Sequence, residues 1–218
     1  MTSISAEESA LVERAIARVE AATGVQIVAA IVPRSDVYPE LPWRAFALGA
    51  SLAGLVALVV DVARPDWLTA QGLLMQTLAI LAGGALAGIA AARLDPFARI
   101  FLGAARATGE ARQCAESLFL TRELFATPRR DAVLMMVSEF ERRVVIVPDV
   151  LCREKVASAE WESVVARMTP LLRTSKVAEA FIAGLDAMHP LLIGKGFAPS
   201  VDGTRNVLAD TLLHENRP

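Results

Sequence analysis

The chain has 218 residues, of which 22 are Lys or Arg, 24 are Asp or Glu and 2 are His, so its formal net charge is −2. Hydrophobic residues make up 54% of it, a share that excludes an intrinsically disordered chain. The nearly balanced charge argues against a basic face that binds nucleic acid. Two cysteines are too few for a disulfide scaffold or a tetrahedral cysteine zinc site.

The first 43 residues predict one helix followed by one buried strand. Ser5 and Glu8 have the spacing of a capping box at the start of the helix. Gly24 is a stop signal, because glycine accepts the left-handed backbone that ends many helices. The run 25–32 is nearly continuous in apolar residues, which is typical of a strand that is buried on both faces.

Residues 44–93 predict a transmembrane hairpin of two helices. Between Ala45 and Ala92 the only charged residues are Asp61, Arg64 and Asp66. We expect spans over about 45–60 and 68–92, joined by a polar turn. The alternative is a hydrophobic hairpin that is buried inside a soluble protein.

Arginines are unevenly distributed around this hairpin. Several flank it on the side of the two termini, whereas the turn carries Arg64 alone. The positive-inside rule therefore predicts a two-span protein of the cell inner membrane with both termini in the cytoplasm.

Small residues recur along both expected spans at four-residue spacing. Ala50 and Gly54 lie on the first, and Gly84 and Gly88 lie on the second. This spacing favours close packing of the two helices against each other. Self-association through the same faces, which would give a homo-oligomer, is the alternative.

The remaining chain predicts the second part of a soluble domain over 94–196 and a C-terminal tail over 197–218. The expected elements are a helix over about 97–125, a β-hairpin of 132–137 and 144–147, two amphipathic helices joined near 170–175, and a short helix near 207–214. The complete pattern predicts an α/β fold. It is an αβα sandwich with a small mixed sheet, interrupted by the transmembrane helical hairpin.

A search for catalytic motifs assigns no catalytic or cofactor-binding residue. The chain has no nucleophile elbow and no complete P-loop. Cys114 and Cys152 lack the arginine six residues later that a phosphocysteine mechanism needs. His189, expected at a helix end, and His214 in the tail are more typical of structural or surface residues.

Three carboxylates are candidate metal ligands. Glu141 and Asp149 bracket the expected β-hairpin, and Asp36 follows the first strand. Carboxylates gathered at strand ends can bind a hard cation such as Ca²⁺ or Mg²⁺. Solvated loop carboxylates are the simpler interpretation, and the spacing leaves both open.

Two segments, 127–138 and 141–149, resemble the signature of the TPM-domain family. That family is named for a thylakoid-lumen acid phosphatase, a photosystem II repair protein and a modulator of a nematode acetylcholine receptor. The residues that carry the resemblance are Phe119, Thr127, Val133, Leu134, Ser138, Glu141, Arg142, Ile146, Asp149 and Trp161. Bacterial members with an inserted membrane hairpin look most similar. The sequence departs from the pattern at Asp131-Ala132, where Thr-Gly is usual, and at Pro148, where Ala is usual.

The resemblance implies binding of Ca²⁺ or another divalent cation at Asp36, Glu141 and Asp149. It also implies two functions. Our leading hypothesis is a non-catalytic scaffold or modulator that docks on another membrane protein. The alternative is a metal-dependent acid phosphatase, for which the sequence offers no nucleophile. A third interpretation is a lipid-surface binder that uses the arginines of 99–112.

Overall fold

The chain folds as two units in a computed structural model, which describes residues 4–64, 69–199 and 212–214. The first unit comprises residues 1–36 and 107–218, and the second comprises residues 37–106. The second unit therefore extends beyond the expected hairpin boundaries of 44–93 on both sides.

A four-stranded mixed sheet forms the centre of the first unit. Its strands are β1 (Gln26–Val32), β2 (Ala132–Ser138), β3 (Arg143–Pro148) and β4 (Leu213–His214), in the order β3-β2-β1-β4. β1 pairs parallel with both β2 and β4, and β2 pairs antiparallel with β3. β1 and β2 are buried along their whole length, as their continuous apolar sequences predict.

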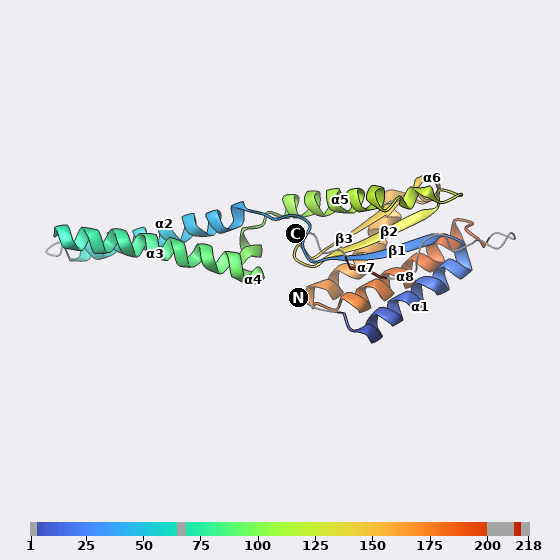
Figure 1. Cartoon of the computed structure of the whole chain (residues 1–218), viewed down its shortest axis with the longest axis horizontal. Helices are drawn as coiled ribbons and strands as arrows, with labels where there is room; N and C mark the ends of the chain where they lie inside the picture. Colours follow the sequence, from blue (N-terminus) through green and yellow to red (C-terminus); the bar gives the residue numbers. More distant parts are fainter. Residues whose placement is uncertain (1–3, 65–68, 200–211, 215–218) are drawn as a thin grey trace. The chain divides into compact units, whose positions relative to one another are not determined.

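Helices cover both faces of this sheet (Figure 1). On one face lie α1 (Ala6–Thr23), α7 (Ser158–Arg173) and α8 (Val177–Gly194), whose apolar residues form one core with Ile27 and Met135. On the other face α5 (Ala104–Thr121) packs on Val28 and Leu134. The mixed α/β class is therefore confirmed, with the expected helix layer on each side of the sheet.

The predicted boundaries of α1 are also confirmed. The Ser5 hydroxyl accepts a hydrogen bond from the Glu8 backbone N–H at 3.1 Å, and the Glu8 carboxylate accepts one from the Ser5 N–H at 2.8 Å. Gly24 ends the helix in the left-handed conformation, with φ of 69°. Local sequence signals were sufficient here because both caps are made by neighbouring residues.

The helix expected over 97–125 is instead several shorter elements. They are α4 (Asp95–Ala98), the 3-10 turn η2 (Arg99–Phe101), α5 and the 3-10 turn η3 (Leu124–Ala126). Leu102, just before Gly103, is extended, which separates η2 from α5. Glu123 has a positive φ of 50° and separates α5 from η3.

Two further expectations differ from the structure. His189 lies inside α8 rather than at its end, because the helix continues past Pro190 to Gly194. The short helix expected near 207–214 lies mostly outside the described residues. Its described end, Leu213–His214, is instead a strand that pairs with β1.

The second unit contains a helical hairpin of α2 (Glu40–Ala63) and α3 (Ala70–Arg93), followed by α4 and η2, which pack against it. Each long helix has 24 residues. At 1.5 Å per residue this is about 36 Å, more than the roughly 30 Å hydrocarbon core of a bilayer. α2 extends beyond the expected span of 45–60 at both ends, whereas α3 begins two residues after the expected start at 68 and ends one residue after 92.

Close packing of the two helices is confirmed, and the expected Gly84 and Gly88 of α3 lie at the contact, next to Phe46 and Pro42 of α2. The tightest approach also involves Gly49 and Gly83, which were not expected. A Cβ on Gly49 would lie 2.7 Å from the Gly83 carbonyl oxygen and 2.7 Å from the Ala87 Cβ, so the backbones meet at this point. At Gly84 the Phe46 ring occupies the space of the missing side chain. A Cβ on Gly54 would have its nearest neighbour, Ile80, at 3.9 Å.

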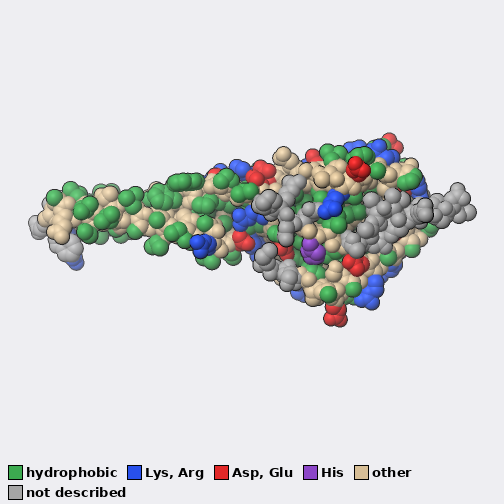
Figure 2. Space-filling model, in the orientation of Figure 1, with side chains coloured by type: hydrophobic (Ala, Val, Ile, Leu, Met, Phe, Trp, Pro, Cys, Tyr) green, Lys and Arg blue, Asp and Glu red, His purple; other side chains and the backbone are tan. Residues whose placement is uncertain are grey.

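Three helices in the described part of the chain are long and apolar enough to cross a membrane, namely α2, α3 and α8. The apolar residues of α8 lie in the core of the first unit, where Phe181, Leu185 and Met188 are fully buried. By contrast, only 6% of the most apolar stretch of α2 and 11% of that of α3 is buried. Hydrophobic side chains accordingly lie along the face of the hairpin that Figure 2 shows.

Candidate functional site

Glu141 lies in the turn between β2 and β3, at the end of the sheet where β1 also ends. Its carboxylate accepts hydrogen bonds from the Ser35 backbone N–H at 2.9 Å and from the Ser138 hydroxyl. The Ser35 hydroxyl lies 2.8 Å from the Ser138 hydroxyl. Because both carboxylate oxygens are used in this way, Glu141 ties the segment after β1 to the end of β2.

Asp36 directly follows Ser35 and therefore lies at the same end of the sheet as Glu141. It is partly buried, whereas Glu141 is 7% exposed. The structure thus brings two of the three predicted metal ligands to one region.

Asp149 lies at the other end of the sheet, directly after β3. Its carboxylate accepts two hydrogen bonds from the Arg130 guanidinium, at 2.8 and 2.9 Å, and one from the Val150 N–H at 2.8 Å. It caps α6 (Val150–Lys155) and is 3% exposed. Asp149 therefore fixes the entry to α6 and holds Arg130 in place.

The three predicted ligands do not form one site. Glu141 precedes β3 and Asp149 follows it, so the six residues of β3 separate them by about 20 Å at roughly 3.3 Å per residue. The described ranges contain no group of three or more His, Cys, Asp or Glu residues that could hold a metal ion. The carboxylates of Glu141 and Asp149 serve as acceptors for protein donors, an arrangement that does not fit a shared cation.

A second buried carboxylate, which the sequence analysis did not propose as a ligand, lies next to Asp149. Asp131 is 2% exposed, and its Oδ2 lies 3.1 Å from the Arg129 Nε. Burial raises the pKa of Asp131, an effect that Arg129 partly offsets. The Asp131 backbone carbonyl accepts a hydrogen bond from the Cys152 thiol.

Cys152 is fully buried beside this carboxylate. Burial, reinforced by the charges of Asp131 and Asp149, raises the pKa of the thiol to about 12. A thiol with this pKa carries almost no thiolate at neutral pH, so Cys152 is a poor nucleophile and a poor metal ligand.

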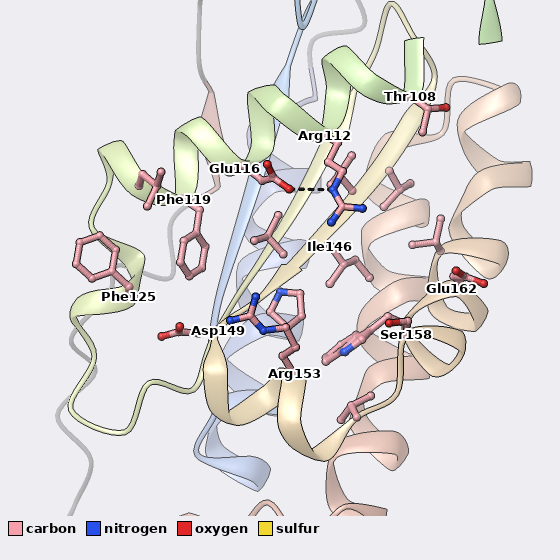
Figure 3. Close-up of a pocket in the computed structure, with 18 of the residues that line it drawn as sticks. Thr108, Arg112, Glu116, Phe119, Phe125, Ile146, Asp149, Arg153, Ser158 and Glu162 are labelled. Carbon is pink, nitrogen blue, oxygen red and sulfur yellow. Dashed lines mark hydrogen bonds and ion pairs between the residues drawn. The ribbon is translucent and has the colours of Figure 1, made fainter. Parts of the chain in front are cut away.

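A groove of about 730 Å³ runs along the outer edge of β3. On one side α5 contributes Thr108, Arg112, Glu116 and Phe119 to its wall (Figure 3). On the other side α7 contributes Ser158, Trp161, Glu162 and Val165. Arg130, Asp149 and Arg153 line the end where β3 finishes. The floor is β3 itself, from Val144 to Pro148.

The backbone groups of β3 alternate between β2 and this groove. The Asp149 N–H donates to the Ala132 carbonyl at 2.8 Å, and the Glu139 N–H donates to the Val32 carbonyl at 3.0 Å. The first bond shows that even-numbered residues of β2 bond to odd-numbered residues of β3. The second bond agrees, because it shows that the odd-numbered residues of β2 face β1 instead. The N–H and C=O groups of Val144 and Ile146, with the Pro148 carbonyl, therefore face the open side.

Sequence reasoning found neither the ion pair of Arg130 with Asp149, nor the buried Asp131, nor the groove. The run Arg129-Arg130-Asp131 before a continuous apolar strand was an available signal, since charges next to a buried strand need partners. Pro148 at the end of β3 was a second signal, because proline favours an edge strand. The walls of the groove come from segments far apart in the sequence, and no local pattern predicts them.

Comparison with known proteins supports the fold alone. No protein-family model matches the chain, and no curated protein matches it. Among solved structures, the chain is similar to the NMR structure of BA42 protein from the psychrophilic bacterium Bizionia argentinensis, with a TM-score of 0.59. The match covers 99% of this chain and 100% of that chain at 13% sequence identity.

Proposed function

We propose that the protein is a membrane-anchored, TPM-like domain that docks on another membrane protein as a non-catalytic scaffold or modulator. The observation that carries the anchor is the exposed apolar surface of α2 and α3. Leu52, Leu74 and Leu86 are 55%, 56% and 69% exposed. Burial of one such side chain contributes about 1.5–3 kcal/mol, and soluble monomers rarely expose a contiguous apolar patch of this extent.

The charges around the hairpin support a cytoplasmic position for the first unit. Arg44 and Arg93 lie at the ends of α2 and α3 from which the chain continues into the first unit. Arg44 donates a hydrogen bond to the Phe101 carbonyl at 3.1 Å. Arg64 alone lies at the opposite end of α2. By the positive-inside rule, this distribution favours an inner-membrane protein with both termini in the cytoplasm.

The contacts of the TPM-like motif residues support a role in folding rather than in turnover. Thr127 accepts a hydrogen bond from the Asp131 N–H at 3.3 Å. Ser138 and Glu141 tie the turn to the segment after β1, and Asp149 caps α6. These interactions explain why such residues occur at these positions without assigning them a reaction.

The anchor is tested by alkaline carbonate extraction of bacterial membranes that contain the full chain. We expect the chain to remain in the membrane pellet. Leu52→Lys combined with Leu81→Lys places a charge near the middle of each long helix. Each charge raises the free energy of membrane insertion by about 2.5–3.5 kcal/mol, so this double variant should be released from the membrane. Leu11→Lys, at an exposed position of α1, is the matched control and should stay in the pellet. Release of the unsubstituted chain would contradict the anchor.

Docking is tested by mild crosslinking in intact cells followed by purification in detergent. We expect one membrane protein to copurify in a constant ratio to the chain, and the Leu52→Lys, Leu81→Lys variant to lose it. Recovery of the chain alone, or of the chain crosslinked only to itself, would overturn a scaffold function.

A further inference from the structure

The outer edge of β3 presents a row of hydrogen-bonding groups that no described residue uses, inside an apolar groove. The open side of the strand offers N–H and C=O groups at Val144 and Ile146 and a C=O group at Pro148. An exposed strand edge is a template for another strand, and such pairing is a recurrent mode of peptide recognition. These groups recur at every second residue of β3, a spacing that the backbone of an added extended strand matches.

The two walls provide a separate apolar trough on each face of an added strand. On the α5 side, Phe119 and Phe125 lie with Val145 and Val147. On the α7 side, the corresponding trough is lined by Val144, Ile146, Val156, Trp161 and Val165. Side chains of an extended segment point alternately to the two faces, so both sets would be accommodated.

The same walls favour a single extended segment over a second folded copy. α5 and α7 both line the groove together with β3, so the strand edge lies between two helices (Figure 3). A second copy would bring its own α5 and α7 to the contact. These helices would have to fit beside the first copy's walls for the two β3 strands to approach to the roughly 4.8 Å of a paired ladder. A single extended segment has no such helices.

The charges in the groove indicate which segment it fits. Arg112 and Arg130 are paired with Glu116 and Asp149, at 2.8 Å in each case. Arg153, at the end of β3, and Glu162, on the α7 wall, line the groove without an ion-pair partner in the described residues. An acidic residue near Arg153 and a basic residue farther along would complement both.

We propose that the β3 groove binds an extended segment of a partner polypeptide, which pairs antiparallel with β3 and carries an acidic residue at its N-terminal end. The inference rests on the proposed function as a docking domain, and it names the chemistry of the partner.

The test measures binding of a fluorescein-labelled peptide, Asp-Val-Thr-Val-Thr-Val-Lys, to the full chain in detergent micelles by fluorescence anisotropy. N-methylation removes backbone donors from one edge of the peptide at a time. Methylation of either the valines or the threonines should weaken binding at least about tenfold, while methylation of the other set should not, since only one edge faces β3. Equal binding of both methylated peptides would overturn strand pairing.

Charge reversal tests the orientation. Arg153→Glu should weaken binding of this peptide and strengthen binding of a peptide that has Lys in place of the first Asp and keeps the last Lys. Arg167→Glu, an exposed substitution on α7 that does not line the groove, is the matched control and should change neither. An unchanged preference in Arg153→Glu would overturn the antiparallel orientation.

The single probe could fail to bind because its side chains do not fit the two apolar troughs. A pool of heptapeptides with Asp first, Lys last and Val, Ile, Leu, Phe or Thr between them removes this ambiguity. If neither the probe nor the pool binds, the groove does not recognise extended segments and the inference fails. A concentration-dependent dimer that the probe dissociates would assign the edge to a second copy and would also overturn it. A chain that binds the probe but leaves membranes in carbonate would instead refute the anchor and keep the groove.

Discussion

Removing the charge of Arg130 should destabilise the protein more than removing the charge of Asp149. The two side chains form one bidentate ion pair, but the Asp149 side chain is 3% exposed and that of Arg130 is 50% exposed. Arg130→Met leaves a buried carboxylate that, among the described residues, accepts a hydrogen bond from the Val150 N–H alone. Asp149→Asn leaves a guanidinium that water already contacts, and Asn keeps the helix cap.

The magnitudes follow from this asymmetry. Breaking a fully buried pair costs about 3–5 kcal/mol, and the exposure of Arg130 reduces this to about 2 kcal/mol for Arg130→Met. Asp149→Asn loses an interaction of the strength of a partly exposed pair, about 0.5–1 kcal/mol. Asp149→Ala also loses the cap, which adds about 1 kcal/mol. At roughly 2–4 °C per kcal/mol, Arg130→Met should lower Tm by about 4–8 °C and Asp149→Asn by about 2 °C.

Thermal unfolding of the three variants in detergent, followed by near-UV circular dichroism, measures these differences. A loss of Tm in Asp149→Asn as large as that in Arg130→Met would refute the reasoning. The same melts in millimolar calcium test the metal hypothesis. Stabilisation of the unsubstituted chain by calcium that disappears in Asp149→Asn would show that Asp149 is a ligand and not only a cap.

The remaining predictions concern packing, titration and the sheet end. Gly49→Ala should lower the temperature at which the chain aggregates in detergent, because the added Cβ would lie 2.7 Å from the Gly83 carbonyl oxygen. Gly54→Ala should not, because its Cβ would lie 3.9 Å from its nearest neighbour. Equal effects of the two substitutions would contradict the observed contact face. Burial raises the folded-state pKa of Asp131 above its ordinary 3.8. The stability of the wild type therefore falls as the pH rises from the ordinary pKa through the folded-state pKa. The Tm of Asp131→Asn relative to wild type should therefore rise from about pH 4 to about pH 7, and a constant difference would refute the titration. Glu141→Gln should destabilise the first unit by about 1–2 kcal/mol, since one amide oxygen cannot replace both acceptors; unchanged denaturant unfolding would exclude this role.

Patterns within single elements predicted much of the fold. The capping box at Ser5, the stop at Gly24 and the buried run of β1 depend on neighbouring residues, so the sequence contains the whole signal. The break at Leu102-Gly103 was missed because the surrounding residues favour a helix and one extended residue is enough to end it. The strand at Leu213–His214 depends on pairing with β1, a contact across about 180 residues that local preferences do not encode.

The candidate sites were less predictable for the same physical reason. Glu141 and Asp149 are eight residues apart in sequence, a spacing compatible with a shared cation, but an extended strand between them places them at opposite ends of the sheet. Arg130 and Asp149 meet because β2 and β3 pair antiparallel, and their partnership appears only once the register is known. The β3 groove requires the packing of α5 and α7 on opposite faces of the sheet.

The measurement that tests the central claim most directly is the reaction of single introduced cysteines with a membrane-impermeant maleimide in spheroplasts. Ala63→Cys lies at the end of α2 that is farther along the chain from the first unit, and Ala166→Cys lies on α7; both positions are exposed. The native Cys114 and Cys152 are buried and should stay unlabelled. The account predicts labelling of Ala63→Cys in intact spheroplasts and of Ala166→Cys only after permeabilisation. Labelling of Ala166→Cys before permeabilisation would contradict a hairpin that spans the membrane with its soluble domain in the cytoplasm.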